Sequence, residues 1–210
     1  MRSPAPLIAI GALLLSACST TTLNEDECRM VDWRTLGYED GVAGHSGERI
    51  SAHRKACAEH GIRPDLDAYR AGRADGLREY CQPHNGYRAG TSGAVYYDSC
   101  PPDLAPGFVV AYESGRQLYV RERRVTDADD QIAARRGEIA RLEAAAAKAP
   151  LVMISETATP EERTQALLDA KNAAERIGRM RTEIVGLEKD RDRYAQELAE
   201  YRATVANVPY

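Results

Sequence analysis

The sequence predicts an all-α protein, in which a small Gly/Tyr-rich helical head held by disulfides precedes a long, coiled-coil-like helical hairpin. Three observations lead to this fold class. Apolar residues recur at helical spacing behind capping residues from 32 to 118, four cysteines fall between 28 and 100, and two heptad-like apolar stripes lie beyond 118. The 210 residues carry a net charge of −4 with both signs interspersed, which argues against nucleic acid as a partner.

The first residues are typical of an export signal. Arg2 supplies a positive charge, and the apolar run Leu7 to Leu15 has signal-peptide length but is too short to span a bilayer as a helix. The tetrapeptide LSAC at 15–18 resembles the bacterial lipobox, which implies cleavage before Cys18 and lipidation of that cysteine. Ser19 after it resembles the pattern of outer-membrane retention. The alternative is an ordinary signal peptide with an incidental cysteine.

A shift in composition divides the chain. Residues 28–115 hold most of the Gly, the single Trp and seven of the eleven Tyr, whereas from 127 onward the chain is mainly Ala, Glu, Arg, Leu and Ile. We therefore predict a signal peptide (1–17), a lipidated tether (18–27), a head (28–118) and a helical tail (119–210). Acyl chains, palmitate among them, would make the membrane a partner of the mature chain without a spanning segment.

Capping residues mark four predicted helices in the head. They begin at Asp32, at Ser46, at Asp65 and near Asp103. The second helix is expected to end at Gly61, and the third at Cys81.

The four head cysteines, Cys28, Cys57, Cys81 and Cys100, point to two disulfides, because exported chains meet an oxidising compartment. Three pairings are possible. If the first two helices form an antiparallel hairpin, Cys28 lies beside Cys57, and the same geometry brings Cys81 to Cys100. We therefore predict the pairs 28–57 and 81–100.

A zinc site is the competing interpretation. Cys57 and His60, like Cys81 and His84, stand three residues apart, which is a spacing found in Cys₂His₂ sites. That site would leave two cysteines as free thiols, and Pro83 places His84 in an expected turn. Disulfides are therefore favoured, and neither a metal nor another cofactor is expected.

Tyr-x-x-Gly occurs four times, at 38–41, 69–72, 87–90 and 112–115. On a helix this spacing sets a ring beside a patch without a side chain, which another helix can approach closely. The structural interpretation is a core of aromatic rings packed on glycine backbone. The functional alternative is a sugar-stacking platform that would bind peptidoglycan through Trp33, Tyr38, Tyr69 and Tyr87.

The motifs together match a known pattern. The segments GYEDG, RKACAEHG, DAYRAGRADGLREYC, NGYRAGTSG and YYDSC carry it. In this combination residues 28–118 resemble the bacterial lipoprotein family known as domain of unknown function 2799. The resemblance implies an envelope location and a fold, but it carries no activity and does not reach the tail.

The tail is predicted to be two helices. Apolar residues of the first stripe recur every seven residues. A second helix is predicted to start at Thr159 and Pro160, and its apolar residues fall into two heptad registers. The first stripe consists of Val125, Ile132, Ile139 and Ala146; the second of Ile177, Ile184, Leu198, Met180, Leu187, Tyr194 and Tyr201. Either the two stripes pair with each other, or another copy or an envelope protein completes them.

Signals for catalysis are weak. His45, His53, His60 and His84 stand in no hydrolase or metalloprotease motif. Asp40, Asp75 and Glu79 could act as carboxylates for glycan cleavage, but neighbouring arginines favour surface ion pairs or helix caps. We therefore expect a non-enzymatic envelope lipoprotein that acts through its coiled coil, the alternative being a glycan-binding module.

Overall fold

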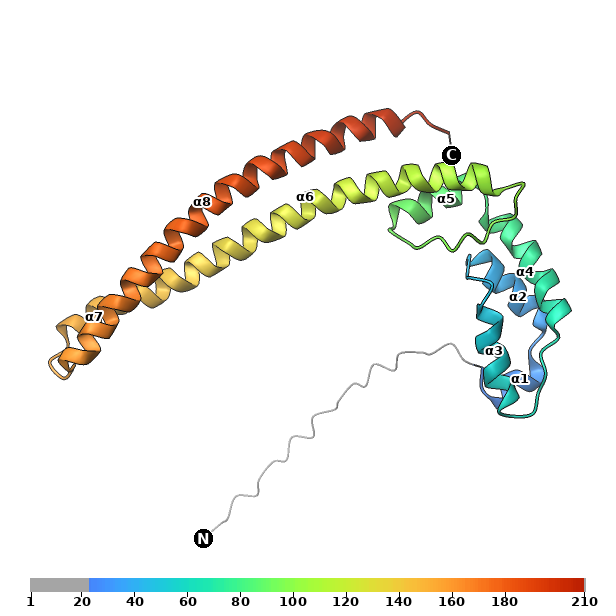
Figure 1. The fold of residues 1–210 in the computed structure, drawn as a ribbon, viewed down its shortest axis with the longest axis horizontal. Coiled ribbons are helices and arrows are strands. Elements are labelled where there is room, and N and C mark those ends of the chain that lie inside the picture. Colours follow the sequence, from blue (N-terminus) through green and yellow to red (C-terminus); the bar gives the residue numbers. More distant parts are fainter. Residues whose placement is uncertain (1–22, 210) are drawn as a thin grey trace, which may run out of the picture.

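The computed structural model describes residues 23–209, so the expected signal peptide and Cys18 lie outside the described residues. Between 23 and 209 the chain is all-α, as predicted, and forms a head and a long two-helix arm (Figure 1). The helices are α1 (Glu25–Met30), α2 (Trp33–Val42), α3 (Arg49–Ala58), α4 (Leu66–Tyr80), α5 (Pro83–Thr91), α6 (Ala105–Ala146), α7 (Ala149–Ile154) and α8 (Pro160–Val205). None of these helices is long and apolar enough to cross a membrane.

Most helix starts follow the capping chemistry in the sequence. Asp32 Oδ1 accepts hydrogen bonds from the backbone N–H groups of Arg34 and Thr35, and Asp65 Oδ1 accepts one from Ala68. Thr159 forms a reciprocal capping box with the glutamate three residues later. These three predicted starts are confirmed.

Two helix starts differ from the prediction. Ser46 lies ahead of α3, which begins only at Arg49, and its Oγ accepts from the Glu48 backbone at 3.3 Å. Pro83 was expected in a turn, but it is the first residue of α5. Proline suits that position because the first helical N–H has no acceptor within the helix.

The head consists of two parallel helix pairs, α2 with α4 and α5 with α6. In the first pair Gly37 faces Tyr69 and Gly44 faces Tyr80, so both helices run in the same direction. The expected pairing of α2 with its sequence neighbour α3 is therefore wrong. Helix α3 instead carries the chain back, and residues 92–104 do the same between α5 and α6.

The two pairs are copies of one packing unit. Gly-Tyr-x-x-Gly-x-x-Gly occurs at 37–44 and again at 86–93. Gly41 meets Gly76 in the first pair as Gly90 meets Gly115 in the second. Each pattern ends on a glycine with positive φ, 69° at Gly44 and 74° at Gly93, which lies under a tyrosine ring from the partner helix. The positive φ and the covering ring both exclude a side chain there.

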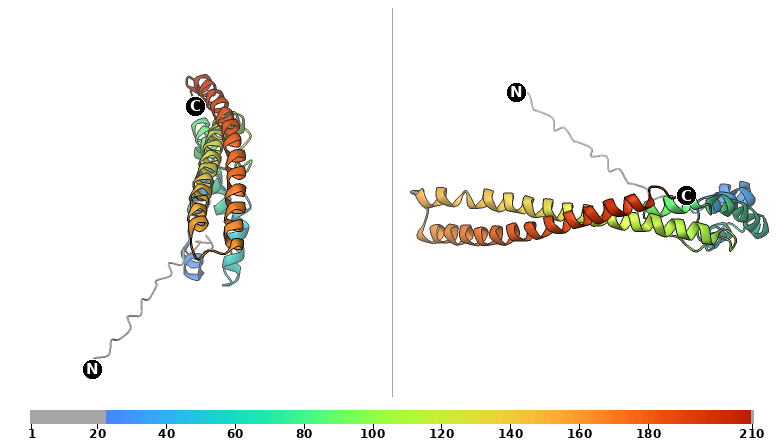
Figure 2. Two further views of the ribbon diagram at one scale, coloured as in Figure 1. Left: turned by 90° about the vertical axis from the view of Figure 1, so that its left-hand side faces the viewer. Right: turned by 90° about the horizontal axis from the view of Figure 1, so that it is seen from above.

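The arm is an antiparallel hairpin of α6 and α8 (Figures 1 and 2). Helix α6 has 42 residues and passes without a break through 118, the predicted boundary of head and tail. Ile132 and Ile139 of α6 are buried against Ile177 and Ile184 of α8, so the two stripes cover each other. The far end of α8 returns to the head, where the Tyr201 hydroxyl donates to the Ser114 carbonyl at 2.9 Å.

Charged side chains on the arm set the register of its two helices. Six arginine–glutamate pairs cross between α6 and α8: Arg124–Glu197, Arg135–Glu183, Arg136–Glu188, Arg176–Glu138, Arg181–Glu143 and Arg202–Glu122. Their side chains are between 30% and 65% exposed, so solvent screens each pair and each adds little to stability. Each pair forms only if the two helices keep this alignment, so the set specifies one antiparallel register.

Candidate functional site

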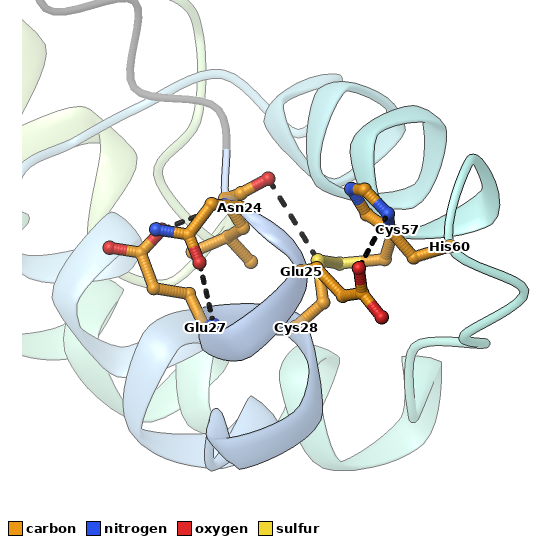
Figure 3. Close-up of a disulfide and its surroundings, with 7 residues drawn as sticks. Asn24, Glu25, Glu27, Cys28, Cys57 and His60 are labelled. Atoms are coloured by element: carbon orange, nitrogen blue, oxygen red, sulfur yellow. Dashed lines mark hydrogen bonds and ion pairs between the residues drawn. A yellow bond between two sulfur atoms is a disulfide. The ribbon is translucent and has the colours of Figure 1, made fainter.

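Two disulfides hold the head together. Cys28 pairs with Cys57 and Cys81 pairs with Cys100, with Cα atoms 5.5 and 5.6 Å apart, which is the predicted connectivity. Cys28 does not precede the first helix but lies within α1, which the disulfide joins to the end of α3 (Figure 3). His60, in the same view, faces Glu25 at 3.6 Å.

The disulfides rule out the zinc alternative. Cys57 and Cys81 were its two thiolate ligands, and each is bonded to a different cysteine. A disulfide sulfur is not a thiolate ligand for zinc. Across residues 23–209 no group of three His, Cys, Asp or Glu side chains is placed to bind a metal ion.

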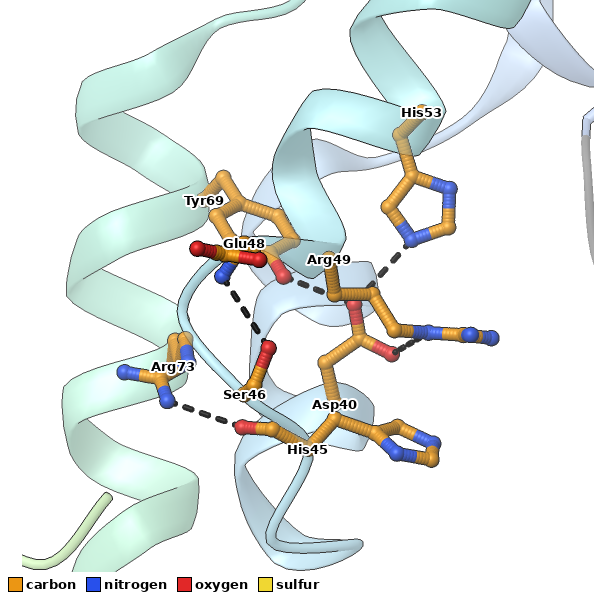
Figure 4. Close-up of polar contacts among 8 residues, drawn as sticks. All are labelled: Asp40, His45, Ser46, Glu48, Arg49, His53, Tyr69 and Arg73. Carbon is orange, nitrogen blue, oxygen red and sulfur yellow. Dashed lines mark hydrogen bonds and ion pairs between the residues drawn. The ribbon is translucent and has the colours of Figure 1, made fainter. Parts of the chain in front are cut away.

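A buried polar cluster joins α2, α3 and α4 around Asp40 (Figure 4). Its Oδ1 accepts from Arg49 Nε at 3.1 Å, its Oδ2 accepts from the Tyr69 hydroxyl at 2.7 Å, and His53 Nε2 lies 3.1 Å from Oδ2. Nearby, Arg73 donates to the carbonyl oxygen of His45 at 2.9 Å. Three helices thus meet on one carboxylate.

Burial alone would raise the pKa of Asp40, but the hydrogen bonds from His53, Tyr69 and Arg49 outweigh it and hold the pKa below its ordinary value. Burial, with Asp40 as its partner, raises the pKa of the Tyr69 hydroxyl. Both are therefore fixed in one protonation state near neutral pH. His53 is only 3% exposed, so the cluster lies in the interior, where its hydrogen bonds hold α2, α3 and α4 together.

The three carboxylates considered for glycan cleavage make separate contacts. Asp75 pairs with Arg34 at 2.6 Å on the surface, and Glu79 accepts from the Tyr38 hydroxyl at 2.8 Å. Asp75 is in the expected surface ion pair, whereas Glu79 is exposed but bonds a tyrosine and not an arginine. Asp40 does not match the expected surface role, because it is buried under α3.

The structure separates the four aromatic residues of the predicted sugar platform. Tyr69 is 1% exposed and belongs to the core, so its assignment as a glycan contact is wrong. Trp33 and Tyr38 lie at least partly exposed on α2. Tyr87 belongs to the second helix pair, where it lines a hollow with Leu118 and the end of α8. The four side chains do not form one surface.

The second unit has an aromatic cluster where the first has Asp40. Phe108, at the position equivalent to Tyr69, is fully buried, and the rings of Tyr80 and Tyr96 each lie 5.0 Å from it. Tyr112 completes the cluster at 5.6 Å from Tyr96. Of the packing predicted from Tyr-x-x-Gly, the close approach of another helix is present, because Gly41, Gly72, Gly90 and Gly115 face the backbone of the partner helix. The rings that cover a glycine, Tyr80 and Tyr119, do so at Gly44 and Gly93.

The tip of the arm carries exposed apolar side chains between the two helices predicted for the tail. Helix α7 presents Leu151 and Ile154, which stand three residues apart on one face of the helix and are 65% and 78% exposed. We call these two residues the tip patch. The apolar run at 151–154 was the available signal.

The turn beneath the tip patch is held by one side chain. The Arg163 guanidinium donates to the carbonyl oxygens of Met153, Ser155 and Ala158, at 3.1, 2.8 and 3.3 Å. A hollow of about 560 Å³ lies between the end of α6, α7 and α8. Half of the residues that line it are alanines: Ala145, Ala146, Ala149, Ala166, Ala170 and Ala173. The tip therefore offers both an apolar surface and a space beside it.

Comparison with known proteins bears on the head alone. Residues 32–117 match the family model described as "Protein of unknown function (DUF2799)". The match begins at the cap of α2 and ends within α6, so it contains both helix pairs and leaves out the arm beyond residue 117. Neither the curated proteins nor the solved structures gave a match. The two-pair head therefore matches the DUF2799 family, and the match covers less than half of the chain.

Proposed function

We propose that this chain is a non-enzymatic lipoprotein, anchored through Cys18 to the outer membrane and facing the periplasm, that contacts an envelope protein through the tip of its arm. The observation that carries the proposal is the tip patch, an exposed apolar group at the end of a long arm. The membrane part is supported by the LSAC tetrapeptide at 15–18.

The arm's own seam is the less suitable interaction surface. Its isoleucines are buried between α6 and α8, so a second copy would have to open the hairpin to reach them. The tip patch is exposed without any such opening. Clustered exposed apolar side chains on a soluble surface are typical of protein contacts.

The geometry of the arm suits a reach across a gap. Helix α6 extends about 45 Å beyond Arg116 at 1.5 Å per residue, and the tip patch lies at its end. An anchored head would thus present the patch well away from the membrane.

Site-specific photo-crosslinking in intact cells tests the interaction. A photoreactive residue at 154 should give one discrete adduct, and the same residue at 179, in the middle of α8, should give none. Leu151→Ser should remove the adduct, whereas Val185→Ser, a matched change at an exposed mid-arm valine, should leave it. Equal crosslinking at 154 and 179 would contradict a role for the tip.

Anchoring has its own test. The wild-type chain should incorporate labelled palmitate and fractionate with the outer membrane, and Cys18→Ser should do neither. A Cys18→Ser chain that keeps the label would refute the lipobox interpretation.

Peptidoglycan binding by the head is the alternative. Without Tyr69 it rests on Trp33, Tyr38 and Tyr87, which lie on two separate helix pairs. Residues 19–210 can be sedimented with purified sacculi. Binding that is lost in a folded Trp33→Ala, Tyr87→Ala variant would put the glycan module first, and absence of binding would leave the tip as the working surface.

A further inference from the structure

A hollow on the head combines an apolar floor with a cationic rim. It has a volume of about 670 Å³ and lies over α3 and the loop to α4. Ile62, Pro64 and Leu66 form its floor, and the rim carries Arg54, Lys55 and Arg63. No carboxylate lines it. We call this hollow the basic pocket.

The three cations of the basic pocket differ from the rest of the head in having no partner. Within residues 23–118 every other arginine makes a hydrogen bond, an ion pair or a ring contact. Arg54, Lys55 and Arg63 make none with any part of the chain that the structure describes. All three are exposed, so their charge is fully available to a ligand. In a chain of net charge −4, this cluster is suited to an anion.

The basic pocket is close to the point where the chain would leave the membrane. The disulfide Cys28–Cys57 fixes α3 to α1, and Leu23, the first described residue, shares a second hollow with Lys55. Leu23 lies only five positions after Cys18, which is a span of at most about 18 Å. A lipidated Cys18 would therefore hold the pocket near the headgroups. The arm tip lies at the opposite end of the molecule (Figure 1).

We infer that the basic pocket binds the phosphate headgroup of an anionic phospholipid in the membrane that anchors the chain. The cations face the phosphate, and the apolar floor receives the adjoining glycerol and first acyl carbons. This inference rests on the proposed anchoring through Cys18. Its consequence is a second attachment, which fixes how the head lies on the bilayer rather than leaving it on a free tether.

Vesicle flotation of the unlipidated chain, residues 19–210, tests the inference. It should bind phosphatidylcholine vesicles that contain phosphatidylglycerol and not vesicles of phosphatidylcholine alone. Lys55→Gln with Arg63→Gln should weaken binding about 30-fold, because each cation at an anionic surface contributes about fivefold. The matched control is Lys189→Gln with Arg179→Gln, an equal charge change at exposed residues of α8. It should leave binding nearly unchanged.

Several outcomes would overturn the inference. These are no binding to anionic vesicles, an equal loss in both double variants, or displacement by inorganic phosphate at matched ionic strength, which would identify free phosphate as the ligand. All four residues are exposed, so both variants are expected to keep the wild-type circular dichroism. Failure of the anchoring proposal is seen separately, as loss of palmitate labelling at Cys18, because the flotation assay uses a chain without lipid.

Discussion

Replacement of Gly41 by alanine tests the close packing of the first helix pair. A Cβ at this position would lie 2.5 Å from the carbonyl oxygen of Arg73, 2.9 Å from the amide of Leu77 and 3.0 Å from the Cα of Gly76. All three are backbone atoms, which cannot turn aside as a flexible side chain can. Since ordinary contact begins near 3.4 Å, α2 and α4 would have to separate by about 0.9 Å.

The expected cost follows from two opposing terms. Overpacking of this kind costs about 3 kcal/mol at the upper end of its usual range, and the higher helix propensity of alanine returns about 1 kcal/mol. Gly41→Ala should therefore lower the free energy of unfolding by about 2 kcal/mol. Gly137→Ala is the matched control, because Gly137 lies within α6 and a Cβ there would have no neighbouring atom within 4 Å. This substitution should raise the free energy of unfolding by about 0.5–1 kcal/mol.

Urea unfolding followed by two signals measures the difference. Fluorescence of Trp33, the single tryptophan, reports the α2–α4 pair, and far-ultraviolet circular dichroism reports all the helices. The midpoint should fall in Gly41→Ala and rise in Gly137→Ala. If both substitutions stabilise the chain to the same degree, the glycines are not required for packing and the reasoning is refuted.

Three further predictions concern other contacts. Asp40→Asn should lower the free energy of unfolding by about 3 kcal/mol at neutral pH. Because folding lowers the pKa of Asp40, the contribution of its carboxylate to stability is present above about pH 4 and is lost as the pH falls through the folded pKa. The free energy of unfolding should therefore change less with pH in the acid range in the variant than in the wild type. The double variant Cys81→Ser, Cys100→Ser should have a free energy of unfolding about 3 kcal/mol below that of the wild type in urea without reductant. Reductant should remove this difference, because both chains then lack this disulfide. Arg163→Met should cost about 2 kcal/mol and speed hydrogen exchange at 153–158, and unchanged exchange there would contradict its role in the tip turn.

Local chemistry accounts for what the sequence predicted well. The caps at Asp32, Asp65 and Thr159 involve hydrogen bonds within three residues, so the residue types alone locate the helix starts. The disulfide pairs were also correct, but for a different geometric reason. Cys28 meets Cys57 because α1 reaches the end of α3, not because α2 and α3 form a hairpin.

Pairing between distant segments accounts for what it missed. Asp40 is buried by residues of two other helices, and Tyr69 is 29 positions away, so nothing near Asp40 marks it as a core residue. The pairing of α2 with α4 depends on glycines that two non-adjacent helices share. The repeated Gly-Tyr-x-x-Gly-x-x-Gly at 37–44 and 86–93 was a visible signal that one packing unit occurs twice.

Helix α6 belongs both to the second helix pair and to the arm, and so works as a lever. Its first turns pack against α5 with no side chain between Gly90 and Gly115, so this contact, which is the pivot, allows little relative movement of the two helices. The free length beyond the pivot is about 45 Å, so a tilt of one tenth of a radian in the head would carry the arm's end through about 4.5 Å. A change in how the head sits would thus be amplified into movement at the far end, and a load at that end would be felt first at these glycines.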